Sequence, residues 1–223
     1  MWLIIFTENT TMKGKLQKKI HDPNEYHSLR FHPYNIALTL GLFSITMLFF
    51  AFSAAYVYTR VQFPEIAPIS LSPVFFFNTM VLLASSWAIN WANRAYLEDN
   101  TTDYQHALKV TIVLTIIFMV GQFIGWNDLS SQLDSQFLAS NLSSYLYLIS
   151  ALHFAHLLAG LPFLLLFYYV AEKRMKEPVS VLVYFSDPEK QLKLNLLTTY
   201  WHYLDVLWIY LILFFLVNSF ISF

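Results

Sequence analysis

The stretch LTTYWHYLDVLWIYLILFFLVNSFI, residues 197–221, decides what kind of fold this chain can adopt. It is apolar almost throughout, and at about 1.5 Å per residue a helix of this length crosses a hydrocarbon core of about 30 Å. Four further stretches share this character, and none shows the period-two alternation of a barrel strand. They are residues 35–58, 73–93, 107–126 and 145–170. We therefore predict an all-α polytopic membrane protein, with a five-helix transmembrane bundle over residues 35–223 and a polar N-terminal extension over residues 1–34.

Composition excludes several other classes of protein. Of 223 residues, 57% are hydrophobic and only 12% are charged, about half the charged share of an average soluble domain, roughly 25%. An ordinary soluble domain and a disordered chain are therefore both excluded. The chain has no cysteine, which excludes disulfides and thiolate metal sites. Its net charge of −1 does not favour a nucleic-acid partner.

The basic residues predict the orientation of the bundle. With the N-terminus in the cytoplasm, every Lys and Arg except Arg60 falls in a cytoplasmic segment. Because positive charge is retained on that side, we expect the N-terminus inside and the C-terminus outside. Within the basic loop before the last helix, residues 179–185 are expected to form a short interfacial strand or turn.

Polar side chains at membrane depth are costly, so they are the candidates for function. His153 and His156 lie three residues apart on the fourth helix, and His202 and Asp205 repeat this spacing on the fifth. Trp201, Asp205 and Trp208 share one stripe. We expect an internal polar network of His153, His156, His202 and Asp205, framed by Trp201 and Trp208, with Asp205 stabilised by a neighbouring imidazole or by the two indole N–H groups.

Other interpretations of these residues stay open. Three imidazoles and a carboxylate could bind a metal, one imidazole could be an axial haem ligand, and the set could relay protons. A stand-alone membrane metalloenzyme or a small transporter would use the same side chains. The sequence contains no phosphate-binding glycine loop, nucleophile elbow or His-Glu-x-x-His motif, and no catalytic residue or metal ligand is assigned.

Two rows of small residues also stand out. Alanine recurs every fourth residue at Ala84, Ala88 and Ala92 on the second helix and at Ala151, Ala155 and Ala159 on the fourth. Such rows let helices approach closely in lipid. We expect them to serve helix packing, with a contact between separate chains as the alternative.

The octapeptide from Trp201 to Trp208 resembles the Trp-His-aromatic-x-Asp-x-x-Trp signature in the last helix of subunit III of haem–copper oxidases. The resemblance covers about 190 residues from near Asn35 onward, in order through all five helices. It is also carried by Asn78-Thr79, Ser85-Ser86 and Ala92, by Thr111, Phe118 and Gln122, and by residues 147–160 with His153, His156 and Gly160.

The chain departs from the family pattern at two positions. The first helix has no acid in residues 43–49, where the family usually has a carboxylate, and Gly125 stands where a glutamate is usual. Proton-handling roles of those carboxylates therefore do not carry over. With five helices instead of seven, the chain is similar to short bacterial members and lacks one wall of the family's lipid-holding cleft.

The resemblance implies an accessory subunit of a proton-pumping terminal oxidase in the cytoplasmic membrane of a bacterium. Such a subunit binds no cofactor of its own, because haem and copper reside in partner subunits. It packs mainly against catalytic subunit I, in a complex with subunit II, stabilises subunit I during turnover and supports proton uptake. Membrane lipids surround it, and a structural phospholipid is a further expected ligand.

Overall fold

The computed structural model describes residues 33–63, 72–133, 140–175 and 177–220. The chain divides into two units, residues 1–41 and 42–223. In the first unit the described part is the start of helix α3 (Pro33–Gln62), and the rest of α3 belongs to the second unit with all other described helices. The predicted N-terminal extension lies outside the described residues, except that Pro33 and Tyr34 already belong to α3.

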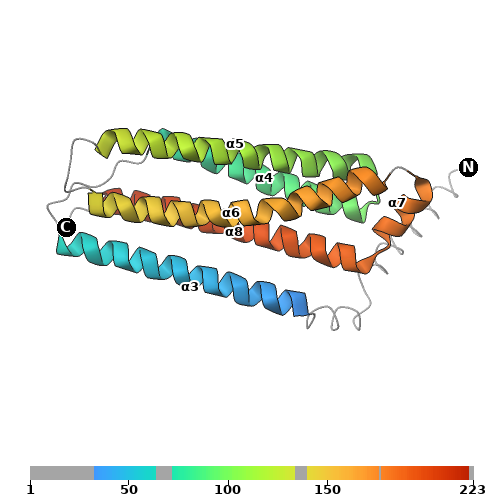
Figure 1. Ribbon diagram of the computed structural model, residues 1–223, viewed down its shortest axis with the longest axis horizontal. Coiled ribbons are helices and arrows are strands. Elements are labelled where there is room, and N and C mark those ends of the chain that lie inside the picture. Colours follow the sequence, from blue (N-terminus) through green and yellow to red (C-terminus); the bar gives the residue numbers. More distant parts are fainter. Residues whose placement is uncertain (1–32, 64–71, 134–139, 176, 221–223) are drawn as a thin grey trace, which may run out of the picture. The chain divides into compact units, whose positions relative to one another are not determined.

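All regular structure in the described residues is helical, which confirms the predicted fold class. Five helices in the described part of the chain are long and apolar enough to cross a membrane, and a short one, α7, separates the last two (Figure 1). The helices after α3 are α4 (Pro73–Leu97), α5 (Thr101–Leu133), α6 (Ser140–Arg174), α7 (Pro178–Phe185) and α8 (Pro188–Phe220).

The helices extend beyond the apolar stretches that predicted them. α5 and α8 each contain 33 residues, about 50 Å at 1.5 Å per residue, against a hydrocarbon core of about 30 Å. Hydropathy marks the lipid-facing length, whereas capping residues set the helix ends. At the start of α8, Asp187 Oδ1 accepts a hydrogen bond from the backbone N–H of Glu189 at 3.0 Å.

A tight turn makes α4 and α5 antiparallel neighbours. Asp99 has a left-handed φ of 54°, and Asn100 caps α5 by accepting from the backbone N–H of Asp103 at 3.2 Å. The two helices then run closely together. A Cβ at Gly125 would lie 2.9 Å from Cε1 of Phe75, so the Phe75 ring fills the space that a side chain at position 125 would need.

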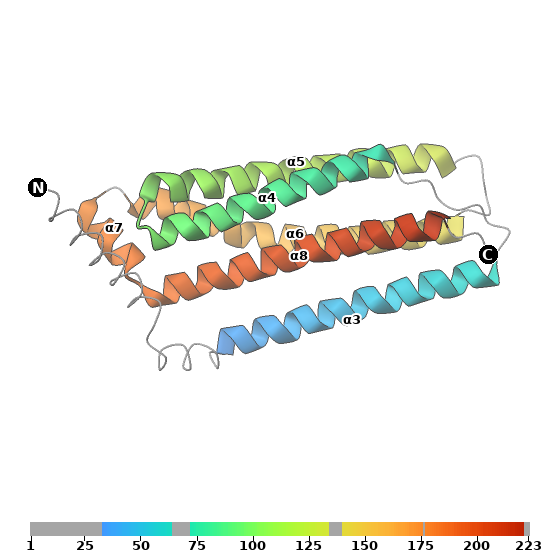
Figure 2. The same ribbon diagram turned by 180° about the vertical axis from the view of Figure 1, so that it is seen from behind.

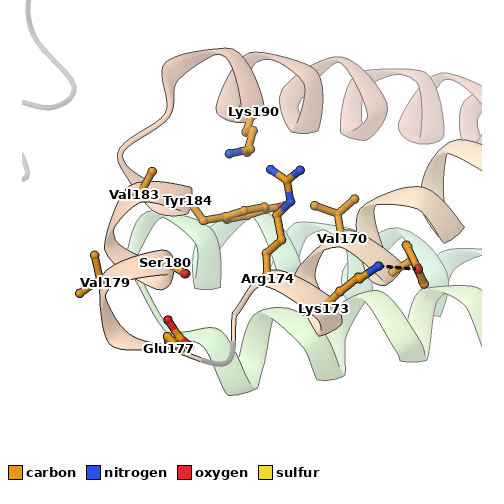
Figure 3. Close-up of a pocket in the computed structure, with 10 residues that line it drawn as sticks. Val170, Lys173, Arg174, Glu177, Val179, Ser180, Val183, Tyr184 and Lys190 are labelled. Atoms are coloured by element: carbon orange, nitrogen blue, oxygen red, sulfur yellow. Dashed lines mark hydrogen bonds between the residues drawn. The ribbon is translucent and has the colours of Figure 1, made fainter.

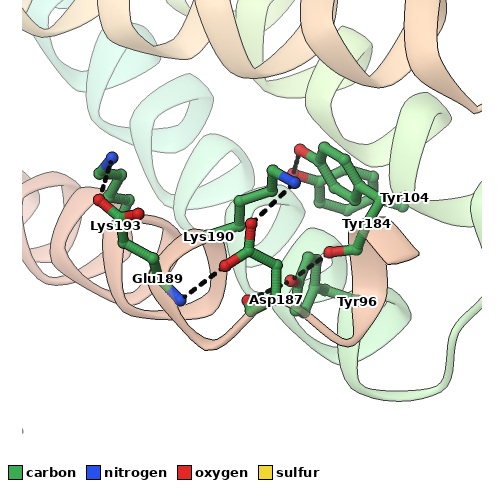
Figure 4. Close-up of polar contacts among 7 residues, drawn as sticks. All are labelled: Tyr96, Tyr104, Tyr184, Asp187, Glu189, Lys190 and Lys193. Atoms are coloured by element: carbon green, nitrogen blue, oxygen red, sulfur yellow. Dashed lines mark hydrogen bonds and ion pairs between the residues drawn. The ribbon is translucent and has the colours of Figure 1, made fainter. Parts of the chain in front are cut away.

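The prediction of a strand or turn over residues 179–185 is wrong, because these residues form helix α7. Pro178 occupies its first turn, a position where proline favours a helix. Tyr184 and Phe185 are buried, and the hydroxyl of Tyr96 donates to the carbonyl oxygen of Tyr184 at 3.1 Å (Figure 4). A short run rich in valine suits a strand or a buried helix equally, and here packing against α4 decides.

Within the unit 42–223, α4 runs beside α5 and α6 runs beside α8, while α8 also contacts α4 (Figure 1 and Figure 2). The part of α3 in this unit contacts the far end of α8. There the ring of Tyr56 packs edge-on against Phe214 and Phe215, at centroid distances of 5.5 and 5.4 Å. α8 therefore contacts α3, α4, α6 and α7, whereas α5 packs against α4 and α6, and Trp201, Asp205 and Trp208 of the α8 motif are buried.

Candidate functional site

The α8 motif forms a seam with α4. Trp201 and Trp208 are each 1% exposed and Asp205 is 4% exposed. Their spacing of four and then three residues places them on one face of α8, as predicted. That face packs against α4, so the seam between α4 and α8 is the candidate functional site.

Both indoles bond to hydroxyl groups on α4. Trp201 Nε1 donates to Ser85 Oγ at 3.2 Å, and Trp208 Nε1 donates to Thr79 Oγ1 at 3.1 Å. The expectation that an indole N–H group stabilises Asp205 is therefore wrong. A tryptophan side chain is long enough to reach the neighbouring helix, and the hydroxyls of α4 stand opposite.

His202 also bonds to α4. Its Nε2 lies 2.9 Å from the amide oxygen of Asn90, and its Nδ1 lies 2.7 Å from Ser86 Oγ. An amide oxygen only accepts, so Nε2 carries a proton and donates to Asn90. In the neutral imidazole, Nδ1 then accepts the proton of the Ser86 hydroxyl. Both ring nitrogens are satisfied by one neighbouring helix.

Asp205 is buried beside His202 without a hydrogen bond to it. Its Oδ2 lies 3.6 Å from His202 Nδ1, which is ion-pair distance but too long for a hydrogen bond. Within the described residues neither carboxylate oxygen has a hydrogen-bond partner. The Ser86 hydroxyl bonds to Nδ1 of His202. The Asp205 carboxyl group is therefore buried at the edge of the seam without a hydrogen bond to that ring.

The other two predicted histidines lie elsewhere. His153 is fully buried, with its ring 5.0 Å from Trp208 and 5.9 Å from Phe118 between centroids. His156 turns back to its own helix, where Nδ1 lies 2.6 Å from the carbonyl oxygen of Leu152. The structure thus divides the predicted network: His202 and Asp205 lie in the seam, His153 lies among aromatic rings, and His156 bonds within α6.

This division bears on the metal interpretation. Over residues 33–63, 72–133, 140–175 and 177–220, no three His, Asp or Glu side chains are grouped so that they could hold a metal ion. The alternative of a centre built from His153, His156, His202 and Asp205 therefore has no geometric support in that part of the chain.

The alanine rows behave differently from each other. Ala88 and Ala92 are fully buried, whereas Ala84, Ala155 and Ala159 are exposed and Ala151 is partly exposed. Packing between helices of this chain therefore does not explain the alanine row on α6, and the expectation that this row serves helix packing is corrected. Gly160 makes the close approach instead, because a Cβ there would lie 2.8 Å from Cε1 of Tyr200 on α8.

Sequence reasoning overlooked several hydroxyl groups that fasten the helices. The hydroxyl of Tyr200 donates to the carbonyl oxygen of His156 at 2.8 Å, and Tyr203 pairs with Thr46 on α3 at 2.9 Å between oxygens. Each residue is common in membrane helices and gives no signal alone. Their position could have indicated them, because Tyr200 and Tyr203 lie one and two residues from Trp201, on neighbouring faces of α8.

A cationic pocket of about 710 Å³ lies where α6, α7 and α8 meet. Arg174 and Lys190 extend toward one another beside Tyr184, and Glu177 lies on the other side of the pocket (Figure 3). Lys190 pairs with Asp187 at 2.9 Å, and the hydrogen bond from Lys190 lowers the pKa of the Asp187 carboxyl below its ordinary value. Burial raises the pKa of the Tyr184 phenol. The pocket was not foreseen, because it depends on α7 being a helix.

Comparison with known proteins identifies the family to which this chain is similar. The family described as "Cytochrome c oxidase subunit III" matches residues 6–219. A "Probable cytochrome c oxidase subunit 3" of Rickettsia felis is 30% identical over 139 residues, which are 62% of this chain and 46% of the relative. The "Cytochrome c oxidase subunit 3" of Loxodonta africana is 25% identical over 203 residues, 86% of this chain and 70% of the relative.

The human "Cytochrome c oxidase subunit 3" is 27% identical over 148 residues, 66% of this chain and 51% of the relative. The match thus spans about half the length of the Rickettsia and human relatives. The family match, by contrast, includes every described residue except Phe220, and with them the whole seam between α4 and α8. This chain therefore belongs to the cytochrome c oxidase subunit III family.

Proposed function

We propose that this chain is a non-catalytic accessory subunit of a proton-pumping haem–copper terminal oxidase in aerobic respiration. In this proposal haem and copper are held by partner subunits. The chain packs mainly against catalytic subunit I, belongs to the same complex as subunit II, stabilises subunit I and supports its proton uptake. Family membership supports the assignment, and the geometry of the seam supports the non-catalytic role.

One observation carries the proposal: the two motifs behind the family resemblance bond to each other. Trp201, His202 and Trp208 come from the α8 octapeptide, and their partners Ser85, Ser86 and Thr79 come from the α4 segment. A nucleophile or metal ligand must keep an atom available for substrate or metal. Here the indole and imidazole nitrogens are engaged with the neighbouring helix, which suits residues that hold a bundle together.

We further propose that subunit I contacts the edge of this seam. His202 is 34% exposed in the chain, Asn90 is exposed, and Trp87 beside them is 68% exposed. His202 lies nine residues beyond Lys193, about 14 Å along α8 at 1.5 Å per residue. Polar groups at such depth normally face protein or water rather than acyl chains, and a neighbouring subunit satisfies this requirement.

The proposed orientation puts the N-terminus in the cytoplasm and the C-terminus outside. Supporting it, basic residues occupy corresponding ends of three helices: Arg94 in the last turn of α4, Lys173 and Arg174 in the last turn of α6, and Lys190 near the start of α8. The positive-inside rule assigns this end to the cytoplasm. The Rickettsia relatives support the cytoplasmic membrane of a bacterium as the location.

A structural phospholipid is the remaining part of the proposal, and the cationic pocket is its proposed site. α7 exposes Val179, Leu182 and Val183 next to Arg174 and Lys190. Exposed apolar side chains beside cations suit the interface of a membrane with anionic lipids. Native mass spectrometry should find less retained phospholipid in Arg174→Gln than in the wild type. Equal lipid retention would contradict this site.

Photo-cross-linking in native membranes tests the docking proposal. A photoreactive amino acid at position 87 should form an adduct with a larger membrane chain, which peptide sequencing should identify as the haem-bearing oxidase subunit. The same group at Val120, an exposed residue of α5, is the matched control and should form much less of this adduct. Adducts with lipid alone at position 87 would contradict the proposed face.

A further inference from the structure

Three fully buried polar side chains from three different helices surround Phe118. They are Asn78 on α4, Gln122 on α5 and His153 on α6, and each has no exposed surface. All three belong to the segments that carry the family resemblance, yet none contributes to the seam between α4 and α8. They are called the central polar cluster below.

Asn78 and His153 each contact Phe118, and helical spacing places Gln122 near the same residue. Asn78 Nδ2 donates to the carbonyl oxygen of Phe118 at 3.4 Å. The ring of His153 packs edge-on against the Phe118 ring, at 5.9 Å between centroids. Gln122 follows Phe118 by four residues, so it lies one turn farther along the same face of α5, about 5–6 Å away between Cβ atoms. Trp208 closes the group from α8, 5.0 Å from both rings.

The cluster is rich in polar atoms without a partner. Among the described residues, no hydrogen bond is made by Asn78 Oδ1, by either amide atom of Gln122 or by either ring nitrogen of His153. A buried polar atom away from water is unfavourable unless it is paired. Neither lipid nor the surrounding aromatic rings can provide the missing bonds, because they offer no comparable donor or acceptor.

The chemistry of these atoms identifies the ligand. An amide offers both a donor and an acceptor, and so does a neutral imidazole. The cluster contains no carboxylate, the group that hard cations prefer, and only one imidazole, and no group of three His, Asp or Glu side chains that could hold a metal ion occurs in the described part of the chain. A buried water molecule typically makes about three hydrogen bonds to buried polar groups of this kind.

We propose that the central polar cluster binds internal water, which bridges Asn78, Gln122 and His153 inside the bundle. The bridging water gives α4, α5 and α6 a shared hydrogen-bonded centre at membrane depth. It also gives the chain a buried hydrated site that adjoins the seam through Trp208. The inference requires only the fold described above and does not depend on the oxidase assignment.

X-ray radiolytic labelling in ¹⁸O water tests the proposal on the full chain, in whatever complex it purifies with. Radiolysis of bound water produces hydroxyl radicals that oxidise adjacent side chains. Trp208 packs against His153, whereas among the described residues Trp201 makes no ring contact with the cluster. Both tryptophans are 1% exposed, so Trp201 is an internal control. We expect Trp208 to be oxidised at least several-fold faster than Trp201. Equal and low rates for the two tryptophans would overturn the proposal.

Two substitutions extend the test. Gln122→Leu with His153→Phe removes the polar atoms at similar volume and should reduce oxidation of Trp208 to the Trp201 level. Thr111→Val is the matched control, because the buried Thr111 hydroxyl already donates to the Ala107 carbonyl oxygen at 2.8 Å; it should leave labelling unchanged. If the double variant does not fold, the comparison of the two tryptophans in the wild type still decides. Direct bonding between Gln122 and His153 would also give the low rates that contradict bound water.

Discussion

His202 on α8 and Ser86 on α4 approach to 2.7 Å between Nδ1 and Oγ, the shortest side-chain hydrogen bond that crosses the seam. The Trp201 bond to Ser85 lies one residue away on both helices. Residues 201 and 202 of α8 thus bond to residues 85 and 86 of α4, and Trp208 bonds to Thr79 farther along the two helices. Sliding α8 along α4 by one turn would break these bonds together, so the polar motif fixes the relative position of two apolar helices that lipid alone would leave undetermined.

Replacing Trp208 separates its hydrogen bond from its packing. Trp208→Phe loses the bond to Thr79, whose hydroxyl keeps its own bond to the Phe75 carbonyl oxygen at 2.8 Å, so the cost should be about 0.6–1.7 kcal/mol. Trp208→Ala also loses the buried ring and should cost about 3–5 kcal/mol. Unfolding of the purified chain by titration with a denaturing detergent measures both. Equal costs would show that the hydrogen bond outweighs the packing.

Glycine substitutions test the close approach of α4 and α5. A Cβ at Gly121 would overlap the amide oxygen of Asn78, whereas a Cβ at Gly41 would meet nothing within 4 Å. Gly121→Ala should destabilise the chain by about 1–3 kcal/mol. Gly41→Ala, the matched control, should be neutral or stabilising by up to about 1 kcal/mol, since alanine is the better helix former. The prediction fails if Gly121→Ala unfolds no more easily than Gly41→Ala.

Ser86 should contribute more to stability than Asp205. Ser86→Ala leaves Nδ1 of His202 without its closest partner, at a cost of about 1–2 kcal/mol. Asp205→Asn keeps the shape of the side chain and breaks no hydrogen bond within the described residues, so its cost should stay below about 1 kcal/mol. The same titration compares the two variants. A larger loss from Asp205→Asn would show that the carboxylate is ionised and paired with His202.

The start of α8 should loosen in acid. Asp187 accepts a hydrogen bond from Lys190, which lowers its pKa in the folded chain. A group with a lowered folded pKa contributes stability above its ordinary pKa of about 3.9 and loses that contribution as pH falls through the lowered value. The protection factor of the backbone amides around residues 186–192, which compares their exchange with the intrinsic rate at the same pH, should therefore fall below about pH 4. Asp187→Asn should remove this pH dependence; an unchanged acid transition in that variant would assign it to another group.

The five spans and the internal face of α8 could be predicted because both depend on local sequence. Lipid requires about 20 apolar residues per helix, and the spacing of Trp201, Asp205 and Trp208 fixes a shared face. Helix ends were less predictable, because the cap at Asn100 lies outside any apolar stretch. α7 was missed because its valine-rich run also suits a strand, and only contact with Tyr96 distinguishes the two.

The partners of the polar residues could not be predicted. Spacing shows that His153 and His156 are near each other, but it does not show that one faces Phe118 while the other bonds to Leu152 in its own helix. The same holds for the alanine rows: α4 buries Ala88, while α6 exposes Ala155. Which face of a helix meets another helix depends on the order of packing in the bundle, and this order is not a local property.

The most direct test of the oxidase assignment is purification of the tagged chain from its own membranes in a mild detergent. The reduced-minus-oxidised spectrum is then recorded across the gel-filtration peak. We predict haem absorption in constant ratio to the chain, together with larger partner chains. A homogeneous single chain, free of haem and of partners, would contradict the account.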